Sequence, residues 1–86
     1  MTMDTQSKEA CEIFESIVEA YERLFKNAPP LRLDSADKVK KEIEGQIKIA
    51  SAYNELGLYQ YCPDKIEDWR KRLRTVAESI KILPSE

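Results

Sequence analysis

The sequence predicts an all-α fold, a small antiparallel three-helix bundle with helices over about residues 4–26, 35–56 and 64–82. Three segments of helical length carry apolar residues at spacings of three and four, the period of one helix face. Two sharp breaks, Ala28-Pro29-Pro30 and Leu56-Gly57, separate these segments. Helices of similar length joined by short links are typical of an up-down-up bundle.

The first helix, over about residues 4–26, has a wide apolar sector. Its central face consists of Ala10, Phe14, Ile17, Tyr21 and Leu24. Further apolar residues flank this face on both sides, so the sector is wider than packing against one helix requires. We therefore expect this helix to contact two or more helices, which favours a homodimer or a partner-bound form. Asp4 is the best candidate for its N-cap.

The second helix, over about residues 35–56, follows two prolines that push the preceding residues out of the helical region. Asp34 offers an N-cap oxygen at its start. Its apolar face consists of Ala36, Val39, Ile43, Ile47, Ala50 and Tyr53. Gly57, directly after Leu56, fits the left-handed residue that ends many helices, and this is the clearest boundary in the chain.

The third helix, over about residues 64–82, has the most regular pattern. Pro63 suits its first position, and Pro84 should end it. The predicted core positions are Ile66, Trp69, Leu73, Val76, Ile80 and Leu83. The three helices form one domain, residues 1–86, because a chain of this length supports only one hydrophobic core.

The overall charge excludes strong long-range attraction to polyanions. The chain has 16 acidic and 14 basic residues, a net charge of −2, so no global field draws it to nucleic acid or to an anionic membrane. No basic and apolar leader opens the sequence, and no apolar run approaches the roughly 18 residues that a bilayer requires. We expect a cytoplasmic protein without membrane association.

The chain has two cysteines, Cys11 and Cys62. Two are too few for a disulfide-rich secreted scaffold and too few for a zinc site made of cysteines alone. The up-down-up topology brings both to the same end of the bundle, within about two helical turns in level, so a disulfide is conceivable. Because the cytoplasm is reducing, two free buried thiols are the favoured interpretation, and the sequence leaves the question open.

The residues needed for common catalytic sites are missing. The sequence has no histidine, which is the commonest general base and metal ligand in proteins. Its two glycines, Gly45 and Gly57, cannot form a phosphate-binding loop. We therefore expect a protein that is not an enzyme and that binds no cofactor and no metal.

An acidic row runs along the first helix, formed by Glu12, Glu15, Glu19 and Glu22. Like charges three and four residues apart destabilise a helix by a few tenths of a kcal/mol per pair. One interpretation is a solvated outer face that Lys8, Arg23 and Lys26 of the same helix partly neutralise. The functional interpretation is an acidic strip that docks on a basic surface of a protein partner, where it sets the association rate and the specificity.

A basic cluster lies in the middle of the third helix and comprises Arg70, Lys71, Arg72 and Arg74. Consecutive helical residues point about 100° apart, so these side chains spread around the helix and do not form one stripe. Ion pairing within the chain, along the helix or between helices, is the simpler interpretation. Contact with nucleic-acid phosphates is the alternative.

Two tyrosines, Tyr59 and Tyr61, lie in the link before the third helix and cannot both easily face the core. If they are exposed, they form an aromatic patch of the kind enriched at protein interfaces. These features predict a small regulator, adaptor or inhibitor that binds a larger protein or assembly. The alternatives are a nucleic-acid-associated regulator that uses the basic cluster and a structural homo-oligomer subunit.

Overall fold

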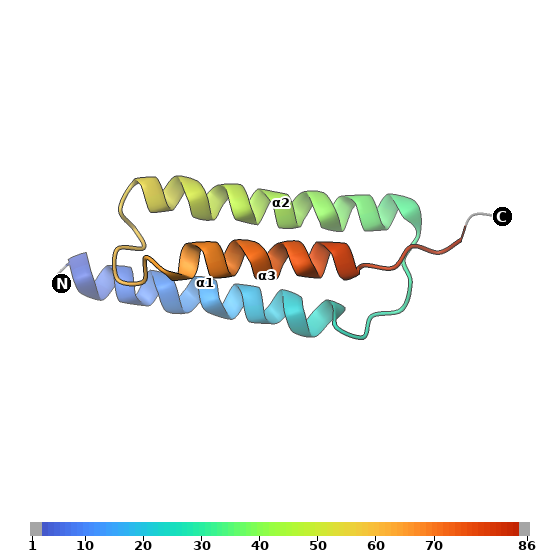
Figure 1. Ribbon diagram of the computed structural model, residues 1–86, viewed down its shortest axis with the longest axis horizontal. Coiled ribbons are helices and arrows are strands. Elements are labelled where there is room, and N and C mark those ends of the chain that lie inside the picture. Colours follow the sequence, from blue (N-terminus) through green and yellow to red (C-terminus); the bar gives the residue numbers. More distant parts are fainter. Residues whose placement is uncertain (1–2, 85–86) are drawn as a thin grey trace.

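The computed structural model describes residues 3–84 and contains three α-helices joined by short links (Figure 1). Helix α1 spans Met3–Phe25, α2 spans Leu33–Glu55 and α3 spans Lys65–Ser79. Helices α1 and α3 run in the same direction, and α2 runs in the opposite direction. The predicted antiparallel three-helix bundle is therefore confirmed.

Helix α3 is the central packing element. It packs closely against both α1 and α2, whereas no comparably close backbone approach joins α1 and α2 within the described residues. In Figure 1, α3 lies over the seam between the other two helices. The bundle is elongated and measures 56 × 21 × 19 Å. None of the three helices is long and apolar enough to cross a membrane.

All three helices contribute to one hydrophobic core. Its most deeply buried large side chains are Val18 from α1, Ile43 from α2, and Trp69 and Leu73 from α3. Trp69 is 1% exposed and packs against Phe14 and Tyr59, with ring centroids 4.7 and 5.1 Å away. Aromatic pairs at such distances contribute about 0.5 to 1.5 kcal/mol beyond the area that they bury. The prediction that Trp69 packs into the core is confirmed.

The predicted stop at Gly57 is also confirmed. Gly57 has a φ of +84°, a conformation that side chains with a Cβ disfavour. The N–H of Leu58 donates to the carbonyl of Tyr53 (3.0 Å), and the N–H of Gly57 donates to that of Asn54 (3.0 Å). These two bonds satisfy helix carbonyls that would otherwise lack a partner, which is the Schellman arrangement.

The three helices start within one or two residues of the predicted positions. Asp4 is already helical, and Asp34 lies in the first turn of α2, where its Oδ1 accepts a hydrogen bond from the N–H of Ser35 (2.9 Å). Pro63 lies in the turn before α3 and not at its first position. In α2 and α3 the residue before the first helical residue makes no side-chain capping bond, so no strong local interaction sets these starts.

The end of α3 differs from the prediction for a tertiary reason. The helix stops at Ser79 because the next residues pair with the link between α1 and α2. The N–H of Leu31 donates to the carbonyl of Lys81 (2.8 Å), and the N–H of Leu83 donates to the carbonyl of Leu31 (2.7 Å). These bonds require extended backbone, which a helix reaching residue 82 could not supply. Ile80 still packs into the core.

The two cysteines form a disulfide, so the favoured interpretation of two free thiols was wrong. Cys11 of α1 and Cys62 of the α2–α3 link are bonded, with a Cα–Cα distance of 6.4 Å. The link reaches α1 because it folds back across the end of the bundle. There the N–H of Tyr61 donates to the Oγ of the buried Ser7 (2.9 Å). The disulfide and this bond together fasten the link to α1.

Candidate functional site

Arg72 is the centre of an ion-pair network between α1 and α3. Its Nε and Nη2 donate to the two carboxylate oxygens of Glu22 at 3.1 and 2.7 Å. Its Nη1 donates to both carboxylate oxygens of Glu15 at 3.0 and 2.9 Å, and to Asp68 at 3.1 Å. Glu15 and Glu22 are seven residues apart, so two helical turns place both on the side of α1 that faces α3. One guanidinium thus joins the two helices.

Glu15 also serves as the partner of the buried indole. The Nε1–H of Trp69 donates to the Oε1 of Glu15 at 2.9 Å. The ammonium of Lys65 lies 3.6 Å from the same oxygen. A buried indole N–H without an acceptor would destabilise the fold. The carboxylate of Glu15 supplies that acceptor and so stabilises the core.

The network shifts the pKa values of its members. Burial alone would raise the pKa of Glu15, but the hydrogen bonds from Trp69 and Arg72, with the charges of Arg72 and Lys65, outweigh it and lower the pKa to about 2. The hydrogen bond from Arg72 lowers the pKa of Glu22. The bonds to these carboxylates, led by that to Glu22, in turn raise the pKa of Arg72. All three groups are therefore ionised at neutral pH.

This arrangement suits structural pairing better than acid–base chemistry. A carboxylate with a pKa of about 2 is a weak base near neutral pH, and a guanidinium does not release its proton there. Among the described residues, no group of three or more Cys, Asp or Glu side chains is arranged to hold a metal ion. The network can position α1 against α3, and it leaves the neighbouring surface available for binding.

The acidic row predicted on α1 divides into two pairs. Glu15 and Glu22 are engaged by Arg72, whereas Glu12 and Glu19 are exposed to solvent. The interpretation that basic residues of the same helix neutralise the row was wrong for Glu15 and Glu22, because their partners lie on α3. Only Glu12 and Glu19 remain free to act as the predicted docking strip.

Two members of the predicted basic cluster are used within the chain. Besides the pairs of Arg72, the guanidinium of Arg70 bonds Glu67 at 2.8 Å and the Oγ of Ser51 at 3.1 Å. The interpretation as ion pairing along the helix and between helices is confirmed for these two arginines. Lys71 and Arg74 are exposed.

The two tyrosines of the link differ in burial. Tyr59 is 3% exposed and packs on Phe14 and Trp69, and its pKa is raised by burial and by nearby Tyr53. Tyr61 is exposed. Tyr59 therefore belongs to the core, and the expected aromatic patch is reduced to Tyr61.

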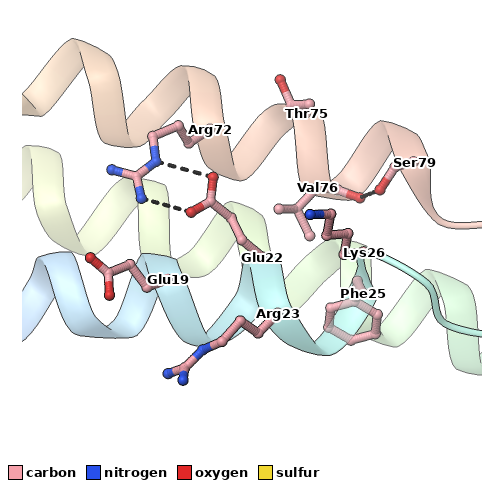
Figure 2. Close-up of a pocket in the computed structure, with 9 residues that line it drawn as sticks. All are labelled: Glu19, Glu22, Arg23, Phe25, Lys26, Arg72, Thr75, Val76 and Ser79. Carbon is pink, nitrogen blue, oxygen red and sulfur yellow. Dashed lines mark hydrogen bonds and ion pairs between the residues drawn. The ribbon is translucent and has the colours of Figure 1, made fainter.

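A groove of about 630 Å³ lies beside the network, between the C-terminal halves of α1 and α3 (Figure 2). Its lining consists of Glu19, Glu22, Arg23, Phe25, Lys26, Arg72, Thr75, Val76 and Ser79. Phe25 and Val76 supply apolar surface, and Glu19 contributes an exposed carboxylate. In Figure 2 the Arg72–Glu22 pair spans the two helices, and Phe25 and Val76 lie further towards their C-terminal ends. We call this feature the α1–α3 groove.

Sequence reasoning named Arg72, Glu15 and Glu22 but did not connect them. The available signal was a seven-residue spacing of two acids on one helix and a central arginine on a second helix that runs parallel to it. Pairing these residues requires the relative position of α1 and α3 along the bundle axis. The turn at Gly57 and the backbone bridge at Leu31 fix that position.

The fold and this groove define the class of the protein as a disulfide-bonded three-helix bundle with a preformed surface groove. No protein-family model matches the chain, and no curated protein or solved structure matches it either.

Proposed function

We propose that the protein is a non-enzymatic protein-interaction module, a small regulator, adaptor or inhibitor that binds a larger protein. The observation that carries this proposal is the α1–α3 groove, whose lining combines the apolar side chains of Phe25 and the largely buried Val76 with the exposed carboxylate of Glu19. Glu12 extends the negative surface two turns further along α1. The matching partner segment places a basic side chain beside an apolar one.

The ion-pair network supports this proposal because it holds the groove in one shape. Arg72 bonds α1 at two positions, Glu15 and Glu22, so the helices that form the groove walls are fixed before a partner arrives. A preorganised surface loses less conformational entropy on binding than a flexible one. Apolar contacts in the groove supply most of the affinity, and Glu12 and Glu19 raise the association rate and the specificity.

Affinity capture with the full chain as bait tests the proposal. We expect Glu12→Lys combined with Glu19→Lys to weaken partner capture at least about 10-fold, because the charge at the groove is reversed. Thr75→Arg, which fills the groove from an exposed position, should abolish capture.

The matched control is Glu44→Lys, a charge reversal at an exposed position of α2 outside the groove. It should leave capture unchanged, and thermal unfolding should show that all variants are folded. If the Glu12, Glu19 and Thr75 variants capture the same proteins as the wild type, the proposal is wrong.

The alternative functions draw different support from the structure. A nucleic-acid regulator needs several cations on one surface, and only Lys71 and Arg74 of the predicted cluster remain unpaired, so protein binding is better supported. A homo-oligomer subunit would instead bury exposed apolar side chains such as Ile13, Leu24 and Leu56 against a second copy.

We also propose that the protein works in an oxidising cellular compartment. The sequence suggested the cytoplasm, but disulfides are rare there and persist in oxidising surroundings. The Cys11–Cys62 bond therefore favours a protein that works in an oxidising compartment.

A further inference from the structure

The α1–α3 groove carries charges of both signs in a fixed order along α1. Glu19 borders the groove at one end, and Arg23 and Lys26 border it towards the C-terminal end of α1. Lys26 directly follows the last residue of α1, and its N–H still donates to the carbonyl of Glu22 (3.0 Å), so the helical path continues to it. Glu19 and Lys26 are seven residues apart and therefore lie on one line of the helix, about 10 Å from each other. The α1 wall is thus acidic at one end and basic at the other.

These charges are available to a partner. Glu19, Arg23 and Lys26 are exposed and take part in none of the ion pairs among the described residues. Glu22 and Arg72, which also line the groove, are paired with each other. A pair between Glu19 and Arg23, four residues apart, would be exposed and weak, so it would not compete with a partner.

The apolar part of the groove lies towards its basic end. Phe25 is half-buried and Val76 is 6% exposed, and Figure 2 shows Lys26 extending towards α3 beside Val76. The aliphatic stems of Arg23 and Lys26 add to this surface, since long basic side chains keep mainly their charged ends in water. The groove therefore fits a partner that presents an apolar side chain close to a carboxylate.

The walls of the groove favour a helix over an extended segment. Both walls are helices, whose backbone groups bond within each helix, so the groove offers no row of free N–H and C=O groups to an added strand. The hydroxyls of Thr75 and Ser79 likewise donate to carbonyls of α3, those of Lys71 and Val76, at 2.9 and 2.7 Å. A helix satisfies its own backbone groups and binds a groove through side chains alone.

The two walls also set the direction of a bound helix. Helices α1 and α3 run in the same direction, so their C-terminal ends lie at the same end of the groove (Figure 1). The negative ends of these two helix dipoles favour the positive N-terminal end of a bound helix. Acidic residues in the first turn of that helix are favoured by its own dipole, and there they face Lys26. Charge order and dipoles thus favour the same antiparallel direction, which α2 also takes against α3.

We propose that the α1–α3 groove binds an amphipathic helix of another protein that lies antiparallel to α1. An acidic side chain in the N-terminal part of this helix lies opposite Lys26 and Arg23, and a basic side chain two turns later lies opposite Glu19. Its apolar side chains contact Phe25 and Val76. The inference rests on the function proposed for this groove and specifies the secondary structure, direction and charge order of the partner.

A displayed library of helical peptides tests the inference. The probe is a phage library of alanine-rich peptides of about 18 residues, long enough for an isolated helix, with one randomised face. The library is selected on the oxidised full chain, and clones that also bind Thr75→Arg are discarded, because this substitution fills the groove. We expect the remaining peptides to carry an acid, then apolar residues, then a base about seven residues after the acid.

A charge exchange in the protein tests the order of the charges. A synthetic peptide of the selected consensus should bind the wild type about 10-fold more tightly than the same peptide with its acid and base exchanged, as measured by fluorescence anisotropy. Glu19→Lys with Lys26→Glu should invert this preference at unchanged net charge. The matched control, Glu44→Lys with Lys48→Glu at exposed positions of α2 outside the groove, should leave the preference unchanged.

The outcomes separate this inference from the proposed function. Groove-dependent peptides without this charge order, or a preference that the exchange of Glu19 and Lys26 does not invert, would overturn the inference and leave the groove as a protein-binding site. A selection without any groove-dependent peptide would overturn it too, whereas partner capture decides the proposed function separately. A wild-type dimer in sedimentation equilibrium that Thr75→Arg abolishes would assign the groove to a second copy and would overturn the inference as well.

Discussion

At the scale of single residues, Glu15 performs a role that its position in an acidic row does not reveal. Its carboxylate accepts hydrogen bonds from the indole of Trp69 and the guanidinium of Arg72, and it lies near the ammonium of Lys65. One side chain thus satisfies a buried donor and pairs two cations. Glu12, three residues earlier, is exposed and has no such partner.

This difference predicts unequal effects of two similar substitutions. Glu15→Gln should lower the free energy of unfolding at pH 7 by about 1 to 3 kcal/mol, because Arg72 and Lys65 lose the charge that they pair with. Glu12→Gln should change it by less than about 0.5 kcal/mol. Urea unfolding of the two variants beside the wild type measures both values, and equal effects would contradict the role of Glu15.

The pH dependence follows from the same group. The pKa of Glu15 is lowered from 4.5 to about 2 on folding, so its ionised form stabilises the native state. This contribution is complete above about pH 4.5 and is lost as the pH falls towards 2. The stability difference between wild type and Glu15→Gln should therefore shrink between pH 5 and pH 2 in urea titrations. A difference that does not change over this range would refute the assignment.

At the scale of elements, the end of α2 and the end of α3 are determined differently. Helix α2 ends through a local device, the left-handed Gly57 and the two backbone bonds around it. Helix α3 ends because Leu31, about fifty positions earlier in the chain, pairs with the backbone at Lys81 and Leu83. The first end was predictable from one residue type, whereas the second required the folded chain.

The two glycines of the chain should respond to alanine in opposite directions. Gly57→Ala should destabilise the protein by about 1 kcal/mol, because φ is +84° there and the new Cβ would lie 2.9 Å from the side chain of Gln60. Gly45→Ala should stabilise it by about 1 kcal/mol, since that residue is inside α2 and the new Cβ meets nothing within 4 Å. Thermal unfolding of both variants is the measurement, and shifts of the same sign would contradict this account.

At the scale of the whole molecule, covalent and backbone contacts close the bundle at opposite ends. The disulfide joins Cys11 to Cys62 at the end where α2 passes into α3. The pairing of Leu31 with Ile82 joins the link after α1 to the segment after α3 at the other end. Between them, α3 holds α1 and α2, which do not pack closely on each other in the described part of the chain.

Removing the disulfide should have the largest effect of any change considered. The bridge spans 51 positions, so its loss in Cys11→Ser with Cys62→Ser should cost about 4 kcal/mol through the greater entropy of the unfolded chain. Urea unfolding of the oxidised protein and of the double variant measures this difference, and equal stabilities would refute it. Thiol alkylation before cell lysis, which should leave both cysteines unmodified, checks the proposed oxidising compartment.

The sequence by itself determined the number of helices, the core face of α3 from Ile66 to Ile80 and the stop at Gly57, because hydrophobic periodicity and glycine chemistry act within a few residues. The predicted central face of the first helix was wrong in part, since Cys11 and Val18 from its flank are buried whereas Leu24 is 69% exposed. Tyr53 and Leu83, also predicted as core residues, are each 46% exposed. Only the tertiary structure decided which acids of the row are paired, that Tyr59 is buried, that the cysteines meet and that α3 stops at Ser79. Each of these outcomes depends on two segments far apart in the chain arriving at the same level and side of the bundle. Local conformational preferences do not determine which distant segments meet. The packing of α3 against both α1 and α2 determines it.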